Sequence, residues 1–67
     1  MNYIVNVSSL MVKRKPSENS KVFIKRDTIV KSAGPPSTYK GERWELVRTL
    51  NEPVIKGYVP RKCIKEI

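Results

Sequence analysis

The residues of this chain that could do chemistry are aromatic and cationic, and they suit binding better than catalysis. Four aromatic side chains are candidates for contact with a ligand: Tyr3, Tyr39, Trp44 and Tyr58. Each offers a flat apolar face with a polar tip, which can stack on a sugar ring or a peptide and still tolerate water when empty. The densest basic cluster is Lys13, Arg14 and Lys15. These cations can pair with carboxylates or phosphates, or simply form a solvated loop.

The role of each aromatic residue depends on where it falls along the chain. Tyr39 lies in a stretch rich in proline and glycine, so we expect it to be exposed and to contact a ligand. Trp44 and Tyr58 fall in two neighbouring extended runs, where they can share one face. For these two residues, packing in the core and contact with a ligand both stay open.

Catalytic chemistry has little to work with in this sequence. Histidine is absent, which removes the usual proton shuttle and the commonest metal ligand. The single cysteine, Cys63, can form no internal disulfide and no metal site, and we expect it to pack as a small apolar group. The six carboxylates are scattered without a paired arrangement. The sequence therefore predicts no catalytic residue, no metal site, no cofactor and no enzymatic activity.

The charge of the chain points to anionic partners. Its 67 residues carry a formal net charge of +8. Such an excess attracts nucleic acid, anionic lipid or an acidic cell-wall polymer, although a basic surface without a specific partner is the alternative. No apolar run approaches the roughly 18 residues of a membrane span. The first seven residues have neither the basic start nor the apolar length of a signal peptide.

Short β-branched and aromatic runs, separated by turn residues, predict an all-β fold. The expected strands are residues 3–7, 10–13, 21–25, 28–31, 43–49, 54–60 and 64–67. Residues 32–42 contain two glycines and two adjacent prolines and are expected to be irregular, while residues 61–63 suit a single 3₁₀ turn. No window has the apolar spacing of an amphipathic helix. A chain of this length forms one domain, so we expect a small barrel or sandwich.

The alternation of apolar residues within these strands predicts which side chains fill the core. The expected core is Val5, Val7, Leu10, Val12, Val22, Ile29, Leu46, Val47, Val59 and Ile64. Leu46 and Val47 are adjacent, and a regular strand cannot point both inward unless a bulge intervenes.

Several short motifs, in order along nearly the whole chain, resemble those of a known family. Residues 9–17 (Ser-Leu-Met-Val-Lys-Arg-Lys-Pro-Ser) and residues 20–22 (Ser-Lys-Val) are similar to the opening of bacterial SH3 (SH3b) domains. Residues 27–30 stand where the family has Gly-x-x-Val. Trp44 with Val47 resembles its Trp-x-x-Val strand, and residues 57–59 (Gly-Tyr-Val) resemble its Gly-Trp/Tyr-Val.

The chain departs from the family pattern at two glycines and in two loops. Lys15 and Asp27 replace glycines, which often supply a positive φ in such loops. The 32–43 loop and the turn around residues 51–53 are longer than is common in the family.

The resemblance implies an SH3-like barrel of five to seven short antiparallel strands that binds and does not catalyse. Many members attach autolysins and phage endolysins to peptidoglycan, so the expected function is to target a peptidoglycan hydrolase to the bacterial cell wall. The expected groove is lined by the aromatic residues at 39, 44 and 58, with the 13–15 cluster at its rim. Two alternatives are a basic barrel that binds nucleic acid and a module that binds a protein peptide. The expected location is the cell wall if the chain belongs to a hydrolase, and the cytoplasm otherwise.

Overall fold

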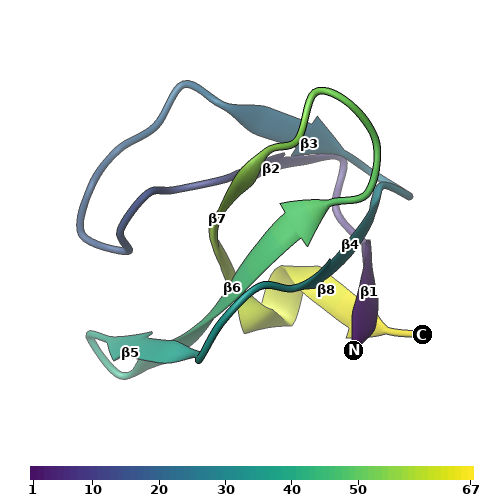
Figure 1. Cartoon of the computed structure of the whole chain (residues 1–67). Helices are drawn as coiled ribbons and strands as arrows, with labels where there is room; N and C mark the ends of the chain where they lie inside the picture. The colour runs from purple at the N-terminus through teal and green to yellow at the C-terminus, as the bar shows by residue number, and fades with distance from the viewer.

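The computed structural model describes all 67 residues, which form short strands and one 3₁₀ turn (Figure 1). The strands are β1 (Asn2–Val5), β2 (Ser9–Met11), β3 (Phe23–Lys25), β4 (Ile29–Ser32), β5 (Ser37–Tyr39), β6 (Glu42–Thr49), β7 (Lys56–Pro60) and β8 (Ile64–Glu66). The 3₁₀ turn η1 is Arg61–Cys63. The predictions of an all-β fold and of this turn are confirmed, with one strand more than the expected five to seven.

The strands form two antiparallel sheets around a single core. The larger sheet has the order β5-β6-β4-β1-β8, with β7 on β6, and the smaller sheet pairs β2 with β3. Figure 1 shows the two chain termini side by side, where β1 pairs with β8. The sheets are joined where Lys13 pairs with Tyr58. There the Lys13 N–H donates to the Tyr58 carbonyl at 2.9 Å and the Tyr58 N–H donates to the Lys13 carbonyl at 2.6 Å, which closes the barrel.

The core draws buried side chains from both sheets. Its members are Tyr3, Val5, Leu10, Val12, Ile24, Val30, Val47, Val59 and Ile64. Six of the ten residues predicted for the core are therefore confirmed. Val7 packs against the core but is only half-buried, and Cys63 packs there as expected.

Three residues predicted for the core lie elsewhere. Val22 precedes β3, which begins only at residue 23, and its side chain is 44% exposed. Ile29 points outward opposite Ile4, because Val30 is the residue of β4 that faces inward. Leu46 is half-buried on the outer face of β6, so that no bulge is needed to turn Val47 inward.

The stretch predicted to be irregular contains the edge strand β5. Ser32 opposes Val47 and Ser37 opposes Trp44, so the four residues 33–36 bulge opposite the two residues 45–46. Residues 40 and 41 join β5 to β6, with φ values of 52° and 76°. This is the positive-φ pair that a two-residue hairpin turn requires. Pro35 and Pro36 lie in this bulge, outside the strands, because a proline has no N–H group to donate to a neighbouring strand.

The two positions where glycine is replaced behave differently. Asp27, in the turn between β3 and β4, has φ 70°. Aspartate tolerates the left-handed region better than most residues, so it can substitute for glycine in this turn. Lys15 is not among the residues with positive φ, so its loop takes a course that needs no glycine.

Gly57 lies at the point where the two sheets meet. A Cβ on this residue would be 2.6 Å from the Lys13 carbonyl oxygen and 2.7 Å from Val12 Cγ1. Both neighbours are fixed, because Lys13 is held by the two hydrogen bonds to Tyr58 and Val12 is buried in the core. The closure of the barrel therefore requires a residue without a side chain at position 57.

Gly57→Ala is expected to destabilise the fold by about 1–3 kcal/mol, because the added methyl group forces β7 away from the segment that follows β2. Urea unfolding followed by the fluorescence of Trp44 measures this change. Gly34→Ala is the matched control, since its Cβ would meet the side chain of the half-buried Leu46 and no backbone atom. Equal midpoints for wild type and Gly57→Ala would contradict the role given to this crossing.

Candidate binding surface

The outer face of β6 and β7 brings two of the predicted binding residues together. Side chains alternate along β6, and Val47 points into the core. Trp44 and Leu46 therefore both lie on the opposite, outer face of the strand. Leu46 is directly opposite Tyr58, and Trp44 is directly opposite Pro60. Trp44 and Tyr58 are therefore diagonal neighbours on one face, within reach of each other's large side chains.

Tyr39 lies on the same side of the sheet, at its far end. Ser37 is directly opposite Trp44, and Tyr39, two residues later, must point to the same side. Its ring is half-buried, and the Lys40 ammonium lies 5.4 Å from the ring centroid. The structure thus places the three aromatic residues on one side of β5, β6 and β7, with Tyr39 on the protruding hairpin.

Lys13 covers the ring of Trp44. The Lys13 ammonium lies 5.1 Å from the ring centroid, in the geometry of a cation–π contact. Trp44 is only 8% exposed, yet it does not belong to the buried core cluster. Its indole Nε1 is buried and has no hydrogen-bond partner. The ring face that the ammonium overlies is closed to a ligand while Lys13 keeps this position.

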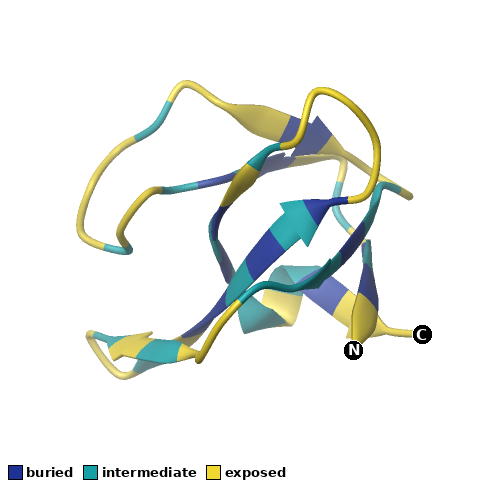
Figure 2. Ribbon diagram, viewed as in Figure 1, coloured by how far each residue is buried: buried dark blue, intermediate teal, exposed yellow.

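Arg14 and Lys15 follow Lys13 into the exposed loop that joins β2 to β3. Figure 1 shows this loop and the β5–β6 hairpin projecting in the same direction, and Figure 2 shows that most of the loop is exposed. The contact between Lys13 and Trp44 joins the bases of these two projections. The basic cluster therefore begins at the aromatic surface and extends away from it.

Tyr3 belongs to the core and lies apart from this surface. It is 3% exposed and its hydroxyl is 3.7 Å from Met1 Sδ. The Arg61 guanidinium carbon is 5.1 Å from its ring centroid. Its ring is packed on the inner face of β1, and so we leave it out of the surface.

Sequence reasoning missed other members of this face. Leu46 and Pro60 contribute apolar surface beside the aromatic rings, and Arg48 continues the outer face of β6. Alternation along β6 could have placed Arg48 with Trp44, because they are four residues apart in one strand. Pro60 could not be placed in this way, because its position depends on the register between β6 and β7.

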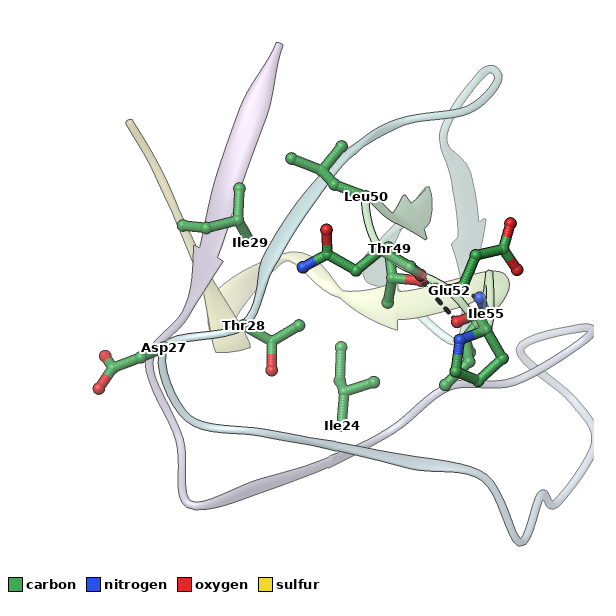
Figure 3. A pocket seen from close by; sticks show the side chains of 10 residues that line it. Ile24, Asp27, Thr28, Ile29, Thr49, Leu50, Glu52 and Ile55 are labelled. Atoms are coloured by element: carbon green, nitrogen blue, oxygen red, sulfur yellow. Dashed lines mark hydrogen bonds between the residues drawn. The ribbon is translucent and has the colours of Figure 1, made fainter.

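A cleft of about 450 Å³ lies elsewhere, between the β3–β4 turn and the β6–β7 loop (Figure 3). Its lining includes Ile24, Thr28, Thr49 and Asn51, and none of the predicted binding residues. Figure 3 shows the carboxylates of Asp27 and Glu52 pointing away from the cleft at opposite ends. Without an inward-facing charge or an aromatic ring, this cleft has little with which to recognise a ligand.

Other chemistry is sparse in the structure, and the comparisons identify no relative of the chain. No three side chains of His, Cys, Asp or Glu come together in a way that could hold a metal ion. No helix has the length and apolar character needed to cross a membrane. Comparison of the chain with protein-family models, with curated proteins and with solved structures gave no match. The resemblance to SH3b domains therefore stays a prediction.

Lys13→Gln is expected to uncover the ring of Trp44. Because Trp44 is the only tryptophan, its quenching by acrylamide reports the change directly, and the quenching constant should rise. Loss of the cation–π contact should lower the free energy of unfolding by about 0.5–1 kcal/mol. Lys40→Gln removes the equivalent cation from Tyr39 and is the control. If Lys13→Gln left the quenching constant at the level of the control, Lys13 would not be the cover.

Proposed function

We propose that this chain is a non-catalytic binding module that targets a peptidoglycan hydrolase to the bacterial cell wall. The observation that supports this most is that Trp44 and Tyr58 are diagonal neighbours on one sheet face. Lys13 pairs with Tyr58 through its backbone and covers Trp44 with its ammonium. Aromatic rings beside apolar residues suit the sugar and peptide parts of a wall polymer, and the cations suit its carboxylates.

The two projections beside this face would give a long polymer more than one point of contact. The β2–β3 loop carries Arg14 and Lys15 as exposed cations. The β5–β6 hairpin carries Tyr39 on the same side as Trp44. In this proposal the central face contacts the apolar part of the polymer. The loop and the hairpin contact the polymer on either side of that face.

Co-sedimentation with purified peptidoglycan, stripped of teichoic acids, tests the proposal. We expect the protein in the pellet at low and at physiological salt, because contact with sugar and peptide does not depend on charge alone. Recovery of the protein in the supernatant at both salt concentrations would overturn the proposal.

Tyr58→Leu is expected to weaken pelleting about fivefold or more, since truncation of an aromatic anchor residue of a binding surface costs about 1 kcal/mol or more. Phe23→Leu is the matched control, because Phe23 is 53% exposed and lies in β3, in the other sheet. Equal loss of binding in the two variants would count against the aromatic face as the site.

Nucleic acid is the second candidate ligand, and one observation favours it. The net charge of +8 is accompanied by only two ion pairs, so that most cations are free to contact phosphates. Against it, proteins that bind single strands stack successive bases on several exposed rings, whereas here Trp44 is buried and Tyr58 is half-buried. Titration with DNA and RNA at two salt concentrations separates the two functions, because nucleic-acid binding should fall steeply with salt.

A further inference from the structure

Three cations lie side by side across the outer face of the large sheet. Lys31 of β4 is directly opposite Arg48 of β6, and Arg48 is directly opposite Lys56 of β7. Residues paired in this way point to the same side of the sheet. The three positive groups, which we call the cation row, therefore cross three adjacent strands that are each ~4.8 Å apart.

No carboxylate neutralises the cation row. The two ion pairs of the structure join Arg43 to Glu45 and Lys62 to Glu42, so neither involves a member of the row. The next residue across the sheet, on β1, is the uncharged Asn2, opposite Lys31. The guanidinium of Arg48 donates only a long hydrogen bond, 3.4 Å, to the carbonyl of Thr49.

The carboxylates of the chain are placed away from the row. Glu18 lies in the β2–β3 loop, Asp27 in the β3–β4 turn and Glu42 at the end of the β5–β6 hairpin. Glu45 lies on the inner face of β6, Glu52 in the β6–β7 loop and Glu66 in the edge strand β8. Like charges directly opposite each other destabilise a sheet. The cation row therefore works against folding and has no partner within the chain that would offset this.

We infer that the cation row binds the phosphate groups of a phosphodiester polymer of the cell wall, an inference that rests on the proposed function. Three cationic residues whose backbones span roughly 10 Å can direct their charges at one phosphate or at two neighbouring ones. Arg48, at the centre, offers the planar fork that matches phosphate oxygens in two hydrogen bonds. Lys31 and Lys56 flank it as point charges.

The surroundings of the row favour a polymer without bases over nucleic acid. The adjacent row of the same face holds Leu46, Tyr58 and Lys13, and Tyr58 is half-buried there. Proteins that bind single-stranded nucleic acid combine cations with exposed aromatic rings on which bases stack. Here the cations are present, but the half-buried ring of Tyr58 is the one aromatic side chain in the adjacent row. One ring can contact a single sugar but not a series of bases, which suits a chain of phosphates linked by polyols or sugars.

The test compares Lys31→Gln/Arg48→Gln with Lys21→Gln/Lys25→Gln, a control pair with the same change in charge. The control residues are exposed and lie in or next to β3, in the other sheet. Binding is measured to walls that keep their teichoic acids, to stripped walls and to inorganic polyphosphate. We expect the row variant alone to lose about tenfold in affinity for intact walls and polyphosphate. The slope of log affinity against log salt should fall by about one for each cation removed.

The urea unfolding midpoint of the row variant should equal or exceed that of wild type, because the variant removes a repulsion between like charges. A lower midpoint would assign the row to the fold and overturn the inference. Equal loss of affinity in the control pair, or tighter binding to single-stranded DNA than to intact walls, would also overturn it. If wild type bound stripped and intact walls equally, the inference would fail while the proposed function stood. If wild type bound polyphosphate but not stripped walls, the proposed function would fail and the phosphate site would stand.

Discussion

The close crossing of β7 over the segment after β2 is the constraint on which this fold depends. Gly57 lets the Lys13 carbonyl and the Val12 side chain approach its backbone to distances that no Cβ would permit. The approach allows the paired hydrogen bonds between Lys13 and Tyr58, which join two sheets that otherwise share no ladder. Because the core takes residues from both sheets, this backbone contact helps to enclose it.

The same crossing also assembles the candidate binding surface. Lys13 is held by its backbone, so its side chain is directed over the outer face, where it covers Trp44. Tyr58, the partner of Lys13, is placed between that cation and Leu46. A contact needed for barrel closure thus also determines which cation lies beside which aromatic ring.

The two faces of β6 differ in whether their charged side chains have a partner of opposite charge. On the inner face Glu45 is buried and accepts a hydrogen bond from Arg43 at 3.0 Å, so its charge is compensated within the chain. On the outer face Arg48 lies between two lysines without a carboxylate, and the indole N–H of Trp44 has no partner. The inner face is electrostatically complete, whereas the outer face has unused charge and unused hydrogen-bonding capacity.

The sequence by itself determined the all-β class, the 3₁₀ turn at residues 61–63, the hairpin of β6 and β7 and most of the core, because alternation and turn residues act locally. It could not determine where β3 begins, so Val22 was predicted for the core although it is exposed. Nor could it determine which residue of β4 faces inward, which is Val30 and not Ile29. The edge strand β5 was missed because it needs β6 as a partner. The burial of Trp44 and the cation row were decided only by tertiary structure, since register between distant strands depends on contacts that no local pattern encodes.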